Sequence, residues 1–457
     1  MTRADDQPGL RLDDVEAVVA ETCFPERPDE RRPGRVGLEL ERFPIHRDGR
    51  GAPAGRCSLA TTMEVLERFG GPRLGARGER RGLPAWRLSG AGDLTFEPGG
   101  QIEHVTNAHA TAAEALAEVT SVSGSLAGAF DAAGGSVASA GIDVWNDVES
   151  VPLQLQSWRY PAMDAYLAAR GSLGRVMMRH TCSLQVNLDL GPPGDRLERW
   201  TLANLLAPLL TATFASSPVD GGVCGRAAAW QVLDSTRTGF PVGFSDASLE
   251  DPVSQMTASA LAADVLLVRT SDQTADPGRP GWTFRDWLTD GHPEYGRPSA
   301  GDLAYHLSTI FLEVRPRGVL EFRGIDAVPH PWRSAPVILL VGALEDPVAR
   351  GRLIELLEPA RSDLAGLWHR SARSGVADPA FCALAVEVWS YALAGAARLP
   401  DDYLPTGGLG DVEVFLERFT LRGRCPADEL REQLIRGPAV SLAWAAEPVP
   451  EDARSSR

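Results

Sequence analysis

Carboxylate and amide side chains occupy alternate positions in four short segments of this sequence. One of them, residues 94–103, reads LTFEPGGQIE. Its alternation of apolar and polar residues is typical of a half-buried strand, because successive side chains leave a strand on opposite faces. A Pro-Gly-Gly triplet interrupts the alternation with a tight turn, after which Gln101 and Glu103 share one face. Taken alone, such a segment is most simply a strand whose polar face is in water.

The repetition of this acid and amide bias favours a cation site over a solvated strand face. The four segments contribute Glu39 and Glu41; Glu97, Gln101 and Glu103; Gln185, Asn187 and Asp189; and Glu321 with Arg323. If they are neighbours in one sheet, their carboxylates converge, and two unit charges about 4 Å apart repel by about 4 kcal/mol at an effective dielectric of about 20. Such a cluster either takes up protons or holds cations. Oxygen ligands on rigid strands suit Mg²⁺ or Mn²⁺, which often bridge to substrate phosphates.

Arginine supplies every cationic side chain apart from histidine. The sequence has 45 lysine and arginine residues, and none of them is lysine. This excludes a P-loop lysine and a lysine Schiff base to pyridoxal phosphate. Arginines within or next to the strand segments could instead pair bidentately with phosphate or carboxylate oxygens: Arg226, Arg237, Arg315 and Arg323. The Trp158–Arg159–Tyr160 segment could stack on a substrate or simply pack in the core.

The elements that would carry these residues indicate an α+β fold. We predict strands at 35–43, 94–97, 101–103, 176–190 and 320–323, and helices at 13–22, 59–69, 111–133, 161–170 and 195–215. Residues 221–239 are predicted to be a loop-and-strand region, and residues 272–298 a cover over the site. Helical patterns dominate residues 332–436, and the tail from 447 is predicted to be disordered. Strands followed by helices favour an antiparallel sheet.

Composition is typical of a soluble globular protein, for which we predict a cytoplasmic location. The apolar share of 44% and the charged share of 23% are ordinary. A net charge of -16 disfavours nucleic acid and anionic membranes as partners, since both select a basic face. The six cysteines include no CxxC pair, so neither a zinc cage nor a disulfide framework is indicated. The N-terminus lacks a signal-peptide core, and the apolar run 335–343 is shorter than the about 20 residues that span a bilayer.

Several ordered motifs resemble the glutamate–cysteine ligase family in its plant-type and actinobacterial branches. LTFEPGGQIE resembles the family's LEPGGQFE signature, RVGLELERF its first acidic strand, and MMRHTCSLQVNLD its T-C-x-x-Q-V-N-L-D strand. WRYPAM, DSTRTG, TFRDWL, STIFLEVRPRGVLEFRGID and PWR are similar to further blocks in the same order, from about residue 35 to 332. The C-terminal helices resemble the family only in general character.

The resemblance implies a glutamine-synthetase-like fold. Such a fold has a curved antiparallel sheet with helices packed on its outer side and a helical C-terminal region. It would form one catalytic domain over residues 1–446, strand-rich at about 35–326 and helical at about 332–436.

The resemblance also implies an ATP-dependent ligase that forms a γ-glutamyl amide with roughly two or three Mg²⁺ ions, or Mn²⁺ in their place. The γ-carboxylate of glutamate attacks ATP, an acyl phosphate forms, and the amine of cysteine displaces phosphate. Positions that match the family's metal ligands are Glu39, Glu41, Glu97, Glu103 and Glu321, with Gln185 completing a shell. Arg323 and Arg237 match its basic catalytic positions, and Arg315 with Arg323 would contact ATP. The substrate-binding candidates are Gln101, Asn187, Arg226, Arg159, Tyr160 and Trp230.

Three alternatives stay open alongside this assignment. A relative could join glutamate to a different amine in a specialised pathway, and a guanidino-kinase-like phosphotransferase would share the sheet architecture. A catalytically silent binding protein would have lost the acids. The arginine-rich, lysine-free composition favours the actinobacterial branch and the ligase that opens ergothioneine biosynthesis. We expect small molecules as partners and a monomer or homodimer.

Overall fold

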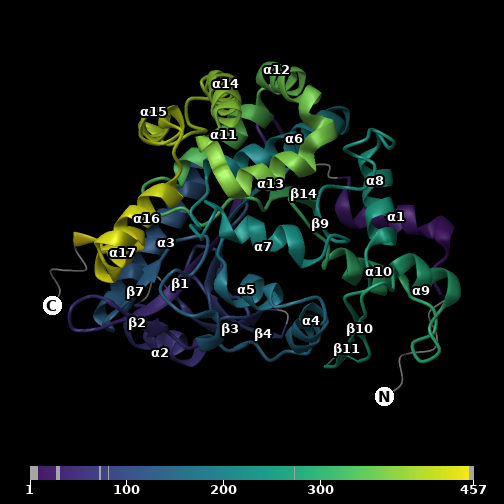
Figure 1. Ribbon diagram of the computed structural model, residues 1–457, viewed down its shortest axis with the longest axis horizontal. Coiled ribbons are helices and arrows are strands. Elements are labelled where there is room, and N and C mark those ends of the chain that lie inside the picture. Colours follow the sequence, from purple (N-terminus) through teal and green to yellow (C-terminus); the bar gives the residue numbers. More distant parts are fainter. Residues whose placement is uncertain (1–8, 27–30, 72–73, 81, 272, 452–457) are drawn as a thin grey trace.

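A ten-stranded antiparallel sheet forms the centre of the structure, which is a computed structural model (Figure 1). The structure describes residues 9–26, 31–71, 74–80, 82–271 and 273–451. Eight strands follow one another in the order β13, β14, β8, β1, β6, β5, β4, β3, while β2 and β7 both pair with the long strand β1. The predicted α+β class with a large antiparallel sheet is confirmed.

The strands of this sheet are short except for β1. Their bounds are β1 Val36–Arg47, β2 Pro53–Arg56, β3 Ala76–Arg80, β4 Leu83–Arg87, β5 Asp93–Phe96, β6 Ile102–Val105, β7 Gly135–Ala138, β8 Leu184–Asp189, β13 Val314–Pro316 and β14 Val319–Phe322. Two smaller sheets lie outside it. They pair β10 Leu267–Arg269 with β11 Ala275–Pro277, and β9 Thr238–Gly239 with β12 Phe311–Leu312.

The central strands have one apolar face and one polar face, as their alternating sequences predict. Val36, Leu38 and Leu40 of β1 are at most 1% exposed and belong to the main hydrophobic core, which also contains residues of helices α6 and α11. Glu39 and Glu41 alternate with them and lie on the opposite face. The apolar face of the sheet therefore packs in the hydrophobic core, and the polar face is available to line a functional site.

Helices cover both faces of the sheet. Their bounds are α1 Leu12–Cys23, α2 Leu59–Phe69, α3 Ala112–Ala132, α4 Arg159–Ala168, α5 Leu173–His180, α6 Arg196–Thr213, α7 Gly225–Leu233, α8 Pro252–Ala262, α9 Phe284–Asp290, α10 Ala300–Leu307, α11 Ser334–Glu345, α12 Pro347–Leu357, α13 Leu364–Ser374, α14 Pro379–Ala396, α15 Gly408–Arg418, α16 Pro426–Arg436 and α17 Pro438–Ala445. Figure 1 shows the C-terminal helices α11–α15 gathered on one side of the molecule, next to α6. Helices α4, α5, α7 and α10 instead contribute side chains to a cavity on the polar face.

The prediction of one long strand over residues 176–190 is wrong in its first half. Residues up to His180 form α5, and only Leu184–Asp189 pair in the sheet. In α5 the buried residues include Gly174, Met177 and Met178, which is helical spacing, and the helix is followed by Thr181, whose hydroxyl donates to the carbonyl of Met177. The sequence pattern did not reveal the change from helical to strand spacing, because a short apolar run is compatible with either structure.

The predicted loop-and-strand region at 221–239 contains helix α7, which spans Gly225–Leu233. Its buried residues include Arg226, Trp230 and Leu233, which lie on one helical face. Only Thr238–Gly239 form a strand, β9. The four-residue spacing of Arg226 and Trp230 is the sequence signal that would have identified the helix.

The tail that we predicted to be disordered from residue 447 is packed at its start. Glu447 is buried, forms an ion pair with Arg333, and its backbone N–H donates to the carbonyl of Val137 at 2.8 Å. Ala446 also forms a β-bridge with Ala138 at the end of β7. A buried carboxylate that is paired with arginine thus fixes this segment, while residues 452–457 lie outside the described residues.

One helix of the described chain, α14, is long and apolar enough to cross a membrane by length and composition. It packs against α11 and α12, and its Phe381, Val388 and Trp389 lie in the main core. Core helices of soluble proteins pass the same test, so this helix is weak evidence for a membrane span.

Candidate active site

A cavity of about 420 Å³ lies against the polar face of the sheet. Its floor carries acids and amides from β1, β6 and β8, and its walls come from the end of α1, from α4, α5, α7 and α10, and from β13. The predicted site residues that line it are Glu39, Glu41, Glu97, Gln101, Glu103, Arg159, Tyr160, Gln185, Arg226, Trp230, Arg315 and Arg323. The strand patterns therefore located the cavity floor correctly.

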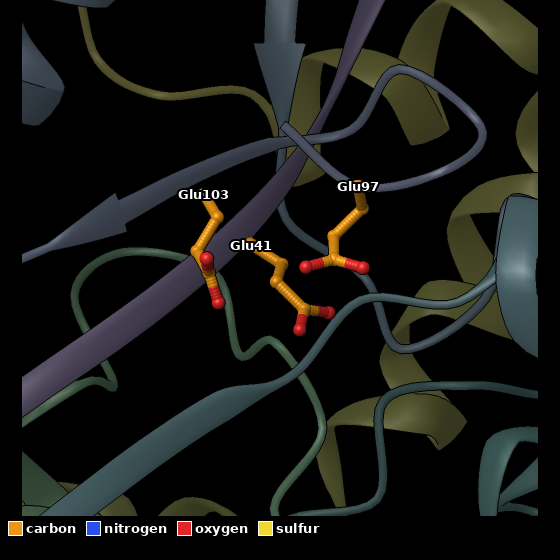
Figure 2. Close-up of side chains that lie close together, drawn as sticks. All are labelled: Glu41, Glu97 and Glu103. Atoms are coloured by element: carbon orange, nitrogen blue, oxygen red, sulfur yellow. The ribbon is translucent and has the colours of Figure 1, made fainter. Parts of the chain in front are cut away.

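Three glutamates from separate segments meet on this floor (Figure 2). Glu41 comes from β1, Glu103 from β6, and Glu97 from the turn after β5. One carboxylate oxygen of each residue lies within 4.8 Å of those of the other two. We call Glu41, Glu97 and Glu103 the acid cluster.

Strand register explains why two of these acids are neighbours. Glu41 lies directly opposite Glu103 across the β1–β6 pair, and Thr95 of β5 lies opposite Glu103 on its other side. The hydroxyl of Thr95 donates to Glu103 Oε2 at 2.5 Å, which fixes that carboxylate. The backbone N–H of Ser183 donates to Glu41 Oε2 at 2.7 Å.

The Pro-Gly-Gly turn places the third acid. The N–H of Gly100 donates to the carbonyl of Glu97 at 2.8 Å, and the N–H of Glu97 donates to the carbonyl of Gln101 at 2.9 Å. Gly100 has φ of 78°, and a Cβ there would lie 2.5 Å from Gln154 Nε2. Only glycine adopts this conformation without strain at such a close approach, so the turn depends on it.

Burial raises the pKa of every acid in the cluster, and repulsion by neighbouring acids contributes for Glu97 and Glu103. Burial is the main cause for each residue, and the charges of Glu103 and Glu41 raise the pKa of Glu97 further, to well above its usual range. Burial, together with Glu321 and Glu103, raises the pKa of the neighbouring Glu39 to about 7. A divalent cation among these oxygens would offset the repulsion, so the donor set fits Mg²⁺ or Mn²⁺.

The two amides predicted for this surface hold the acids in place. Gln185 Nε2 donates to Glu41 Oε1 at 3.1 Å, while its Oε1 accepts from Arg323 Nη1 at 3.0 Å. Asn187 Nδ2 donates to Glu39 Oε1 at 3.2 Å, but Asn187 does not line the cavity. In this arrangement both amides orient carboxylates, and the oxygen of Gln185 is already used by an arginine.

Glu321, which we predicted to be a metal ligand, lies beneath three arginines. Its carboxylate contacts Arg315 at 2.8 Å, Arg317 at 3.0 Å and Arg323 at 2.5 Å. Burial opposes ionisation of this carboxyl, but the three guanidinium groups outweigh burial and lower its pKa to about 2. Glu321 is therefore an anchor for arginines in this structure, and it does not line the cavity.

Two further arginines reach the cavity from helices. Arg159 at the start of α4 contacts the hydroxyls of Tyr305 at 3.3 Å and Ser308 at 3.4 Å, and forms no ion pair within the described chain. Arg226 of α7 donates to the carbonyl of Arg323 at 2.7 Å, and its other terminal nitrogen lies 3.8 Å from Asp326. Arg159 is thus held by neutral acceptors, whereas Arg226 also forms a long ion pair with the buried Asp326; both line the cavity, where they suit a ligand carboxylate.

The predicted catalytic role of Arg237 does not agree with its position. Arg237 is 0% exposed, does not line the cavity, and donates to Asp234 Oδ2 at 2.7 Å and to the carbonyl of Thr309 at 2.8 Å. Its third partner is the carbonyl of Asp264. These bonds occupy the guanidinium group within the core, so Arg237 is a structural residue.

A second, smaller cavity of about 170 Å³ adjoins the first at the acids. The two cavities share Glu39, Glu97, Glu103, Tyr160 and Arg317 as lining residues. Sequence reasoning missed Arg317, although it follows Arg315 at the two-residue spacing of a strand face. It also missed Thr95 and Arg80, both of which line the smaller cavity.

Clustered acids next to arginines on an antiparallel sheet are a donor set that suits a metal-chelated phosphate. Comparison with known proteins gives the family. The family described as glutamate–cysteine ligase family 2 (GCS2) matches residues 35–444. The chain belongs to this family, and the prediction of an ATP-dependent ligase is confirmed.

Two bacterial relatives and one plant relative illustrate the similarity. Glutamate–cysteine ligase EgtA of Mycobacterium tuberculosis (strain CDC 1551 / Oshkosh) is 32% identical over 439 residues, which cover 93% of this chain and 90% of that protein. EgtA of Mycolicibacterium smegmatis is 34% identical over 365 residues, covering 78% and 81%. A chloroplastic glutamate–cysteine ligase of Medicago truncatula is 32% identical over 333 residues, covering 70% and 63%. The resemblance seen in the sequence motifs to both bacterial and plant branches is confirmed.

Proposed function

We propose that this protein joins the γ-carboxylate of L-glutamate to the amine of L-cysteine, with ATP and a divalent metal ion, through a γ-glutamyl phosphate. The observation that carries this proposal is the acid cluster on the cavity floor, in a chain that belongs to a glutamate–cysteine ligase family. Cysteine as acceptor and ergothioneine biosynthesis as the pathway are supported by the similarity to EgtA.

The metal would be held by Glu41, Glu97 and Glu103, with Glu39 beside them. None of these three carboxylates forms an ion pair within the described chain, and burial raises the pKa of each. When bound, Mg²⁺ or Mn²⁺ would neutralise charge on the phosphoryl group that is transferred. The order of ionisation among the three acids belongs to the cluster as a whole.

The amino-acid end of glutamate would bind where α4 and α7 bring Arg159 and Arg226 to the cavity. Arg159, which forms no ion pair within the described chain, would bind its α-carboxylate, and Arg226, whose ion pair with Asp326 is 3.8 Å long, would assist. Gln101 Nε2 donates to the carbonyls of Met178 at 3.4 Å and Thr181 at 3.0 Å, which fixes the amide. Its Oε1 is buried with no partner in the described structure and would accept from the α-ammonium group.

The γ-carboxylate would then point toward the acid cluster, where phosphate transfer takes place. Arg323 is suited to the phosphate oxygens, since it lines the cavity and is held by Glu321 and by Gln185. Trp230 supports it from behind, with the guanidinium carbon 5.7 Å from the ring centroid. Positioning and charge neutralisation supply most of the rate in phosphoryl transfer, which agrees with a site rich in fixed charges.

An end-point assay tests the proposal. Purified protein is incubated with ATP, Mg²⁺, glutamate and a panel of amines that includes cysteine, and ADP and γ-glutamyl products are measured by mass spectrometry. We expect ADP and γ-glutamylcysteine in equal amounts. ADP formed only with another amine would overturn cysteine as the acceptor, and a phosphorylated guanidino product would favour a phosphotransferase.

A further inference from the structure

The smaller cavity adjoins the larger one at the acids and shares none of the residues that suit the α-carboxylate of glutamate. Arg159 and Arg226 line only the larger cavity, whereas Arg80 lines only the smaller one. Glu97 and Glu103 line both cavities and therefore form the wall between them. A metal-bound phosphoryl group at this wall would face both spaces.

Reaction geometry assigns a ligand to each side, provided that the proposed function holds. In phosphoryl transfer, the attacking and leaving oxygens lie roughly in line on opposite sides of phosphorus. With glutamate in the larger cavity as the attacking group, the leaving oxygen of ADP must lie toward the smaller one. At about 170 Å³ the smaller cavity is below the roughly 300–1,000 Å³ of pockets that enclose a whole ligand. It suits the phosphate tail of the nucleotide, with the base outside it.

Two arginines border this space, and their surroundings differ. Arg317 is already paired with Glu321 at 3.0 Å. Arg80 is the last residue of β3, pairs with Leu83 across the β3–β4 hairpin, and is half-buried. It forms no ion pair or side-chain hydrogen bond within the described chain, although it lines the same cavity as Glu97 and Glu103.

We propose that Arg80 is a further nucleotide-binding residue, which contacts the β-phosphate side of ATP and of the departing ADP from the β3–β4 hairpin. In a chain without lysine, a guanidinium group is the available side chain for a charge-assisted phosphate contact here. This role rests on the guanidinium charge of Arg80, which lies beside Glu97 and Glu103 and forms no ion pair within the described chain. Replacing Arg80 should therefore weaken nucleotide binding without changing glutamate binding or folding stability.

The test compares Arg80→Gln with Arg77→Gln, a matched control on the same strand. Arg77 is exposed and lies 3.7 Å from Glu67, away from the acid wall. We expect Arg80→Gln to raise the KM for ATP and the Kd for ADP by about 10- to 100-fold, the effect of losing charge-assisted hydrogen bonds. The KM for glutamate and the Tm should match the wild type, and Arg77→Gln should match it throughout.

Two results would overturn the assignment of Arg80. One is a wild-type KM for ATP and Kd for ADP in Arg80→Gln, and the other is an equal loss of affinity in Arg77→Gln, which would indicate a general charge effect. The ADP titration also separates this inference from the proposed function. If the wild type binds ADP but forms no γ-glutamyl product, the proposed reaction fails while Arg80 is still tested by the change in Kd.

Discussion

Buried carboxylates in this protein lie in two opposite electrostatic environments, one without an arginine partner and one with. In the acid cluster, Glu41, Glu97 and Glu103 face one another; burial raises the pKa of all three, and repulsion by neighbouring acids raises the pKa of Glu97 and Glu103 further. Below the cavity, Asp234 is surrounded by Arg237 at 2.7 Å and Arg170 at 3.2 Å. Burial opposes its ionisation, but Arg237 outweighs burial and lowers the pKa of Asp234.

The difference separates residues that stabilise the fold from residues that serve a ligand. A buried charge that supports folding is paired, since leaving it unpaired costs several kcal/mol. Carboxylates that remain unpaired and close together lower stability and persist where a ligand supplies the missing charge. Arg237 and Arg80 show the same contrast among the cations, because one is enclosed by acceptors and the other forms no ion pair or side-chain hydrogen bond within the described chain.

The largest expected effect is on activity at the acid cluster. Glu103→Gln removes one charge from the proposed metal site and should lower kcat/KM by at least about 10²-fold, the scale for losing one electrostatic group in an active site. Without metal, its Tm should equal or exceed that of the wild type, since a repulsion is relieved. Ligase assays and thermal unfolding check both, with exposed Glu64→Gln of α2 as the control. Equal loss of activity and stability would show that Glu103 is structural.

Removing the cation from the Arg237–Asp234 pair should instead lower the stability of the fold. Arg237→Met leaves Asp234 in the core without its closest cation and should lower the free energy of unfolding by about 3–5 kcal/mol. Arg352→Ala is the matched control, because its pair with Glu355 is exposed and worth about 0–1 kcal/mol. Urea unfolding measures both. If the Arg237→Met variant kept its stability and lost only kcat, a catalytic role for Arg237 would be restored.

A smaller effect concerns pH. Glu118 of α3 accepts from His104 at 3.1 Å, from His109 at 2.6 Å and from the N–H of Gly92 at 3.0 Å. Burial opposes its ionisation, but these bonds outweigh burial and lower its pKa from 4.5 to about 2. Because the folded pKa is depressed, the stability it contributes is present above pH 4.5 and is lost as pH falls through about 2.

Glu118→Gln tests this sign. At pH 7 the variant should be less stable by about 1–3 kcal/mol, the range for a hydrogen-bonded charged group. Between pH 4.5 and 2 its stability should fall less steeply than that of the wild type, because it lacks the group that takes up a proton. Parallel curves over this window would contradict the depressed pKa.

Sequence patterns predicted the polar face of the sheet because strand alternation is local. Glu39, Glu41 and Gln185 lie where their two-residue period places them. What surrounds a side chain depends on segments distant in sequence, and this is where prediction failed. The sequence predicts the correct sheet face for Glu321, but it does not predict that three arginines pair with this carboxylate. It also predicts Arg237 in the site, although Asp234, Thr309 and Asp264 enclose that side chain in the core.

The central claim is that the acid cluster is left unpaired in order to bind a divalent metal ion with the nucleotide. Titration of Mn²⁺ into the protein with ADP, followed by the electron paramagnetic resonance signal of free Mn²⁺, tests it most directly. The wild type should bind Mn²⁺, and Glu41→Gln and Glu103→Gln should each bind it at least about 10-fold more weakly, while Glu64→Gln binds it as the wild type does. Equal Mn²⁺ affinity in all four proteins would contradict the claim.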